Sequence, residues 1–269
     1  MKFFSIPPTS ALSLMDWNKN YFCLAHIALK NKEYKDFFKD RADHGFHVIL
    51  DNGAAEGSLI NSKDLIKLAK YIKPTELIAP DTLFDKTKTL SDLKKFKRSL
   101  PVCLNKTKLF AVPQGSTPDE WLTCYIEMLN DPAVDTIGLS KLSIPKAFCK
   151  ITDSNSVSVN RRYVVKLLNE LNLLTKPIHL LGMRSPSEFE AYKNMPNIRS
   201  SDSCYTVLSA VNCEDFDPNT ISDTISSTPE EYFDLELTKF DSYQACVNIE
   251  KLNEAYDLNK TGGNNGKNR

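Results

Sequence analysis

The sequence predicts an α/β protein that folds as a single (β/α)8 TIM-like barrel with a C-terminal helical extension. Short apolar runs recur about eight times along the chain, and helical patterns lie between several of them. The length of 269 residues, with 41% hydrophobic content, suffices for one large core. An open doubly wound sheet is the main alternative, because it has the same alternation of strands and helices.

Each expected strand is a short run of apolar residues bounded by turn residues. In chain order, the runs are Lys2–Ile6, Tyr21–Ala25, His47–Leu50, Glu76–Ala79, Lys108–Val112, Asp135–Leu139, Pro177–Leu181 and Asn197–Ser201. Five segments between them have helical patterns: Ser62–Tyr71, Leu90–Ser99, Pro118–Asn130, Asn160–Leu171 and Pro186–Lys193. Thr117 and Ser185 each precede a proline and an acidic turn, which is typical of a helix N-cap.

The pattern changes after Ala210. Val211–Thr228 is rich in Asn, Asp, Ser and Thr and predicts a long surface loop, whereas Pro229–Tyr256 predicts helical structure that packs on the barrel. The last ten residues are basic and rich in Gly and Asn. We therefore expect one barrel domain over residues 1–258 and a disordered basic tail over residues 259–269.

Composition narrows the class of function. The formal net charge is +0, from 34 basic and 34 acidic residues, so a nucleic-acid contact would need a local patch. The seven cysteines form no CxxC pair and no cluster with histidine, so neither a metal nor a cofactor that needs one is expected. Their odd number and the absence of a signal peptide favour free thiols in the cytoplasm. No apolar run approaches the roughly 20 residues that span a bilayer, so no membrane partner is expected.

Carboxylates close three of the apolar runs, at the strand ends where a barrel places its active site. Asp51 follows Leu50 and precedes Asn52, Asp81 follows a second run, and Asp202 follows a third. Asp51 or Asp81 alone is explained equally well as a turn or helix cap, whereas Asp202 lies among small hydroxyl residues that we expect to hydrogen-bond it. Three carboxylates at one mouth repel one another, however, so together they favour a functional site. A nucleophile, a proton carrier and an acceptor for the N–H edge of a base are roles that suit them.

Three other run ends combine a glycine with a side chain suited to a flat ligand: Gln114-Gly115, Gly138-Leu139 and Gly182-Met183. Glycine allows the backbone to approach a planar ligand closely, and a methionine packs well against a ring. His179 lies inside its run, which favours a hydrogen-bonded core histidine over a catalyst.

These strand ends, in this order, resemble the tRNA-guanine transglycosylase family, and more closely its short bacteriophage relatives thought to place 7-deazaguanine bases into DNA. The matching segments are Asp51-Asn52-Gly53, Asp81, Val112-Pro113-Gln114-Gly115, Ile137-Gly138-Leu139-Ser140, Leu181-Gly182-Met183 and Ser201-Asp202-Ser203. Pro113 is an insertion, and the family's Cys-Val-x-Pro-Thr-Arg stretch does not follow Asp202. The Cys/His zinc subdomain that helps the tRNA enzymes bind RNA is missing, which favours the DNA branch.

The resemblance implies a guanine transglycosylase for DNA modification, which exchanges guanine in nucleic acid for a 7-deazaguanine derivative such as 7-cyano-7-deazaguanine. Asp202 would attack C1′ and form a covalent aspartyl-sugar intermediate, and Asp51 would carry the proton. Asp81 would accept hydrogen bonds from the guanine edge. Gln114 and the Gly138 backbone would contact the base, while Met183 and Leu139 would cover its faces. No cofactor is implied, and the reaction would occur in the cytoplasm, the host's if a phage encodes the protein.

Three other functions fit the same residues: a tRNA-guanine transglycosylase, a nucleoside or glycoside hydrolase, and a non-catalytic base-binding subunit. A homodimer is also left open.

Arg184 and Arg199 are the favoured phosphate contacts, because they lie near the proposed pocket strands. Weaker candidates are the basic tail, Lys86, Lys88, Arg161, Arg162 and the cluster from Lys94 to Arg98, since lysine runs on helices are usually solvated faces.

Overall fold

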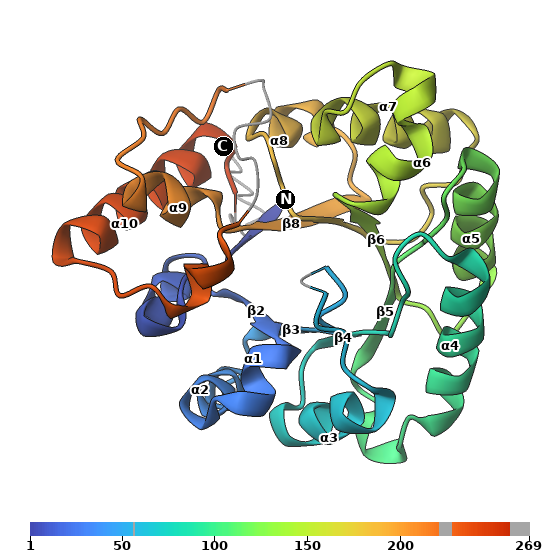
Figure 1. The fold of residues 1–269 in the computed structure, drawn as a ribbon, viewed down its shortest axis with the longest axis horizontal. Helices are drawn as coiled ribbons and strands as arrows, with labels where there is room; N and C mark the ends of the chain where they lie inside the picture. The colour runs from blue at the N-terminus through green and yellow to red at the C-terminus, as the bar shows by residue number, and fades with distance from the viewer. Residues whose placement is uncertain (56, 221–227, 259–269) are drawn as a thin grey trace, which may run out of the picture.

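Eight parallel strands surround the centre of the protein in the computed structural model, which describes residues 1–55, 57–220 and 228–258 (Figure 1). The strands are β1 Lys2–Ser5, β2 Asn20–Leu24, β3 His47–Asp51, β4 Glu76–Ile78, β5 Lys108–Ala111, β6 Thr136–Ser140, β7 Ile178–Leu181 and β8 Ile198–Ser203. Every expected strand is therefore confirmed, with ends that shift by one or two residues. The extension of β8 places Asp202 inside the strand, opposite Phe4 of β1.

The strands close into a nearly complete barrel, which excludes the open doubly wound sheet. The hydrogen-bonded order is β1-β8-β7-β6-β5-β4-β3-β2, and every pair in it is parallel. The strands at the two ends of this order, β1 and β2, are also neighbours. The Asn20 side chain joins them, because its Nδ2 donates a hydrogen bond to the Phe3 carbonyl oxygen at 3.2 Å.

The five expected helices form part of the outer layer: α3 Ser62–Ile72, α4 Lys86–Ser99, α5 Pro118–Asn130, α7 Val157–Glu170 and α8 Ser187–Tyr192. Helix α4 begins a turn earlier than expected, because Asp85 caps it by accepting a hydrogen bond from the Lys88 N–H. The expected cap at Thr117 is confirmed. The expected cap at Ser185 is wrong: its hydroxyl donates instead to the carbonyl oxygen of Thr220.

Several helices were not expected from the sequence: η1 Thr9–Trp17, α1 Ala25–Lys30, α2 Lys32–Asp43, η2 Val102–Leu104, α6 Ser143–Thr152 and α9 Tyr205–Val211. Helix α2 is strongly charged and buries only Tyr34 and Phe38, so its apolar periodicity is weak. Helix α6 contains Pro145, which is tolerated because it lies in the first turn, where a backbone N–H has no partner within the helix.

The C-terminal extension is confirmed, although it is not one continuous helix. It consists of η3 Glu230–Asp234 and α10 Lys239–Ala255, and Thr238 starts α10 with a capping box. Ala245 and Ile249 of α10 pack against η1 and α9, beside β1 (Figure 1). Val211 ends α9 rather than starting a loop. Residues 212–220 lack helix and strand, whereas residues 221–227 and the expected disordered tail, 259–269, lie outside the described residues.

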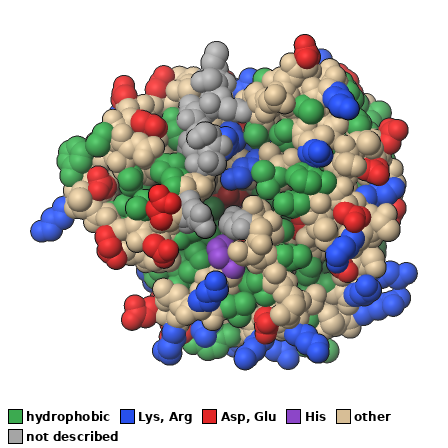
Figure 2. All heavy atoms as spheres, viewed as in Figure 1, with side chains coloured by type: hydrophobic (Ala, Val, Ile, Leu, Met, Phe, Trp, Pro, Cys, Tyr) green, Lys and Arg blue, Asp and Glu red, His purple; other side chains and the backbone are tan. Residues whose placement is uncertain are grey.

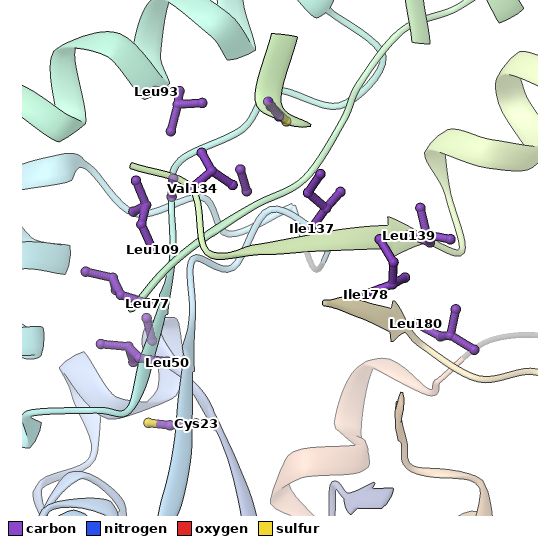
Figure 3. Packing of buried hydrophobic residues seen from close by; sticks show 14 of the residues in the cluster. Cys23, Leu50, Leu77, Leu93, Leu109, Val134, Ile137, Leu139, Ile178 and Leu180 are labelled. Carbon is purple, nitrogen blue, oxygen red and sulfur yellow. The ribbon is translucent and has the colours of Figure 1, made fainter. Parts of the chain in front are cut away.

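Two apolar layers follow from the two-residue period of the strands. Outward-facing residues such as Leu50, Leu77 and Leu139 pack with the helices in the main core (Figure 3). Inward-facing residues such as Phe22 and Phe110 fill the barrel interior. Because the alternate positions point inward, Asp51 and Asp202 at the carboxyl ends of their strands lie above this apolar interior.

Candidate active site

A cavity of about 860 Å³, open mouth included, lies at the carboxyl ends of the strands. Figure 2 shows the corresponding face hollowed near its centre, with Lys or Arg side chains at the hollow. Seven of the ten predicted site residues line this cavity: Asp51, Asn52, Asp81, Gln114, Gly182, Met183 and Asp202. The structure thus brings together residues from five strand ends that are separated by up to about 150 positions in the sequence.

Asp202 is held through one of its two carboxylate oxygens. His179 Nε2 lies 2.9 Å from Oδ1, and the Gly182 N–H donates to the same oxygen at 3.1 Å. Among the described residues, no hydrogen bond falls on Oδ2. Since Asp202 lines the cavity, Oδ2 is the oxygen left to interact with a ligand. The side chain is nearly buried, at 6% exposure, so it is shielded from bulk water.

His179 is the partner that the sequence did not assign to the site. Its ring is fully buried, stacks on Phe22 and contacts Phe110 edge-on, as a core histidine would. Burial lowers the pKa of His179, so the ring is neutral at pH 7. Its Nδ1 lies 2.8 Å from the Ser200 hydroxyl, which donates to it when Nε2 carries the proton. The ring then donates from Nε2 to Asp202 Oδ1.

The small hydroxyl residues that flank Asp202 do not bond to it directly, which corrects an expectation from the sequence. Ser201 Oγ donates to the carbonyl oxygen of Leu180, and Ser203 Oγ donates to that of Met183. Ser200 acts on Asp202 only through His179. The Asp202 carboxylate is therefore held by a ring and a backbone N–H from β7 and the turn after it, not by neighbours in sequence.

Asp51 ends β3 at a tight turn. Its Oδ2 accepts a hydrogen bond from the Gly53 N–H at 2.8 Å, and the Ser58 N–H closes the loop onto the Gly53 carbonyl oxygen. Gly53 has φ of +79°, and a Cβ there would lie 2.6 Å from the Ser58 carbonyl oxygen. Only glycine fits this turn, which fixes the Asp51 carboxylate at the cavity wall.

Asp81 belongs to a buried network with two amides. Asn52 Nδ2 donates to Oδ1 at 2.6 Å, and Gln114 Nε2 donates to Oδ2 at 2.5 Å. Asn52 also donates to the Ala79 carbonyl oxygen, and Gln114 Oε1 accepts from the Phe84 N–H. The two amides therefore fix the plane of the Asp81 carboxylate and connect the ends of three adjacent strands.

Three predicted residues lie near the cavity without lining it. Gly115 is packed against α5, where a Cβ would lie 2.5 Å from the Trp121 nitrogen. Gly138 faces the barrel interior, where a Cβ would lie 2.6 Å from Phe110 and 2.7 Å from Leu181. The Leu139 side chain points outward into the main core (Figure 3). Glycine at the first two positions is explained by these close packing contacts.

The cavity has apolar walls to which distant parts of the chain contribute. Ile78 and Val112 come from the sheet and its ends, whereas Phe233 comes from η3. The Thr9 hydroxyl donates to the carbonyl oxygen of Phe233, and the Tyr232 hydroxyl donates to that of Ile6, so η3 is anchored to the start of η1 and to the turn after β1. No local sequence pattern indicates that η3 reaches the barrel mouth.

Of the proposed phosphate contacts, Arg184 lines the cavity. Arg199 does not: it lies near the amino end of β8 and forms an ion pair with Glu76 at the start of β4. Arg161 is fully buried and faces Glu188 at 3.2 Å, so it is a structural residue. Lys141 lines the cavity and was missed, although it follows Ser140, the last residue of β6, and so occupies a typical active-site position in a barrel.

Metal sites, disulfides and membrane spans are three further features by which the described residues bear on function. No group of three or more His, Cys, Asp or Glu side chains there is placed to hold a metal ion. All seven cysteines have free thiols. Within the described ranges, no helix combines the length and apolar character that crossing a membrane requires.

Comparison with known proteins adds no family assignment. No family model matches the chain, and no curated protein matches it. The fold is a (β/α)8 barrel, an architecture that hosts many unrelated reactions, so the site itself has to carry any functional conclusion.

Proposed function

We propose that this protein is a guanine transglycosylase that exchanges guanine in DNA for a 7-deazaguanine derivative in the cytoplasm. The observation that carries the proposal is one cavity lined by three carboxylates in three different settings. Asp202 is bound through one oxygen by neutral donors, Asp51 is fixed by a glycine turn, and Asp81 is clamped by two amides. Different environments for neighbouring carboxylates are the means by which enzymes give them different roles.

In the first half of the reaction, Asp202 Oδ2 attacks C1′ of the target nucleotide. A bond forms between Oδ2 and C1′ as the bond from C1′ to guanine N9 breaks, and its electron pair leaves with the base. The product is a covalent sugar ester, as in retaining glycosidases. The hydrogen bonds to Oδ1 orient the carboxylate so that Oδ2 faces the sugar.

Asp51 carries the proton in both halves. As the carboxylic acid, it protonates the departing guanine; as the carboxylate, it takes the N9 proton from the incoming 7-deazaguanine, whose N9 then attacks C1′ and releases Asp202. Each exchange thus returns both carboxyl groups to their starting state. Its fixed position on the Gly53 turn is suited to a group that must reach N9 of the departing base and then N9 of the incoming base.

Asp81 is suited to recognise the base. A carboxylate fixed in plane accepts hydrogen bonds from two adjacent N–H groups, such as guanine N1–H and its exocyclic amine. Bases without these donors would leave a buried acceptor unpaired, which disfavours them. Asn52 and Gln114 act by positioning Asp81, while Met183 and Phe233 supply apolar surface for the ring. The target nucleotide must be flipped out of a duplex or come from a single strand.

The test measures uptake of labelled base into a polymer. Purified protein is incubated with radiolabelled guanine, or with labelled 7-cyano-7-deazaguanine, and with duplex DNA, single-stranded DNA or tRNA. We expect label to enter DNA with the wild type and not with Asp202→Asn or Asp51→Asn. Asp202→Asn also removes the covalent adduct, which denaturing electrophoresis of protein and oligonucleotide detects.

Other outcomes distinguish the remaining functions. Entry of label into tRNA alone would identify the protein as a tRNA-guanine transglycosylase. Release of free base and sugar without uptake of label would assign a hydrolase. Base binding without any turnover, equal in wild type and Asp202→Asn, would assign a non-catalytic subunit. Each of these results contradicts the proposal of base exchange in DNA.

A further inference from the structure

The cavity divides into two chemically different sides. Asp81 and Gln114, which suit a base edge, follow β4 and β5. Lys141 and Arg184 follow β6 and β7, and Asp202 lies on the next strand, β8. Figure 1 shows β8 on the opposite side of the barrel from β3 and β4. In the strand order, the two cations therefore lie between Gln114 and Asp202, and Arg184 is on the strand next to Asp202.

The position of Lys141 is coupled to that of Asp202. The Lys141 N–H donates to the Leu181 carbonyl oxygen, and the aliphatic stem passes over Gly182. A Cβ on Gly182 would lie 2.3 Å from Lys141 Cδ, and Gly182 has φ of +70°. Gly182 therefore both holds Asp202 Oδ1 through its N–H and leaves room for the lysine stem. Lys141 is thereby placed beside the carboxylate that we assign as nucleophile.

The charge of Lys141 is not used within the described part of the chain. No ion pair or hydrogen bond joins its ammonium group to a carboxylate there, although three aspartates line the same cavity. Within the described residues, Asp202 instead accepts hydrogen bonds from a neutral ring and a backbone N–H. A lysine that faces a cavity without an acidic partner is suited to an anionic part of a ligand.

We propose that Lys141 and Arg184 bind a phosphate next to the sugar of the target nucleotide, and this inference rests on the proposed function. In a nucleotide, the sugar joins the base to the phosphate. Along the rim of the barrel, Lys141 and Arg184 lie between Gln114 and Asp202, so a sugar with its C1′ at Asp202 can direct its attached phosphate toward them. Barrel enzymes commonly bind phosphate with the loops after their seventh and eighth strands, and Arg184 lies in the first of these. The subsite selects nucleotides within a strand over free nucleosides.

Binding of small ligands tests the subsite without turnover. In the Asp202→Asn protein, calorimetry compares deoxyguanosine with its 5′- and 3′-monophosphates. We expect one monophosphate to bind roughly tenfold more tightly than the nucleoside, the effect of one or two charge-assisted contacts. Lys141→Met and Arg184→Met should each reduce this advantage, and Lys141→Arg should retain it. Lys150→Met is the matched control, because it removes a lysine from the far end of α6.

Oligonucleotide binding gives a second measure. For single-stranded DNA, each lost phosphate contact should reduce the slope of log K against log salt by about 0.7. An unchanged slope and an unchanged monophosphate advantage in Lys141→Met would overturn the inference, as would the absence of any such advantage in the parent protein. Base exchange could fail in every polymer while Lys141 still makes a monophosphate bind more tightly than the nucleoside. That result would refute the proposed reaction and support the phosphate subsite.

Discussion

The donor that His179 provides to Asp202 offers a sharp test of the site. In His179→Leu, the hydrogen bond of 2.9 Å to Asp202 Oδ1 is lost, the Gly182 N–H remains, and the Ser200 hydroxyl loses its partner ring. In His179→Gln, an N–H donor remains on a side chain of similar reach. The pair of variants therefore separates the hydrogen bond from simple filling of the barrel interior.

The size of the effect follows from the type of bond. A hydrogen bond to a charged group contributes about 1.5–3 kcal/mol, and each 1.36 kcal/mol changes a rate tenfold. We expect base exchange by His179→Leu to be roughly 10- to 150-fold slower than wild type at pH 7. His179→Gln should recover much of the rate, because it keeps an N–H donor to Asp202.

The assay is single-turnover exchange of labelled base into DNA between pH 5 and pH 9. Urea unfolding of each variant confirms that the protein tested is folded. Ser200→Ala, which removes only the group that orients the ring, should show a smaller slowing in the same direction. A folded His179→Leu protein with a rate within twofold of wild type would refute the positioning role. Equal losses of rate in the folded Leu and Gln variants would show that His179 is only a packing residue.

Three further predictions concern stability and follow from buried or strained groups. Gly182→Ala should lower the free energy of unfolding in urea by about 1–2 kcal/mol and slow exchange, because φ is positive and the Lys141 stem fills the space; unchanged values would contradict this. Burial raises the pKa of Glu76, but hydrogen bonds from His47 and Arg199 outweigh it and hold the pKa well below the ordinary 4.5. The unfolding free energy of the wild type should therefore fall as pH drops below about 4.5, and a Glu76→Gln protein with the same pH slope would show that another group is responsible. Arg161→Met should destabilise by about 3–5 kcal/mol, because it removes the cation facing buried Glu188, and calorimetric unfolding within 1 kcal/mol of wild type would exclude that role.

The sequence by itself determined the strands and the carboxylates that end them. An apolar run that stops at a polar residue is a local pattern, and parallel strands bring their carboxyl ends to one edge, so Asp51, Asp81 and Asp202 could be assigned to one mouth. The glycine at position 53 was equally visible as part of a turn. What these residues share is that their placement depends on neighbours within a few positions.

The direction of a side chain at a strand was less certain, because a shift of one residue reverses the face. Gly138 and Leu139 show this: the glycine faces the barrel interior and the leucine faces the helices, so neither lines the cavity. Position along the strand matters as well. Arg199 precedes Asp202 by three residues, about 10 Å along an extended strand, which takes it away from the mouth to Glu76.

Only the tertiary structure decided which groups act on the three aspartates. His179 reaches Asp202 from a neighbouring strand, Asn52 and Gln114 reach Asp81 from both sides, and Phe233 arrives from the C-terminal extension. These contacts join residues far apart in the chain, and they depend on barrel closure, strand register and helix packing together. A local pattern contains none of that geometry, so it identified the carboxylates of the candidate site but not the contacts that hold each of them.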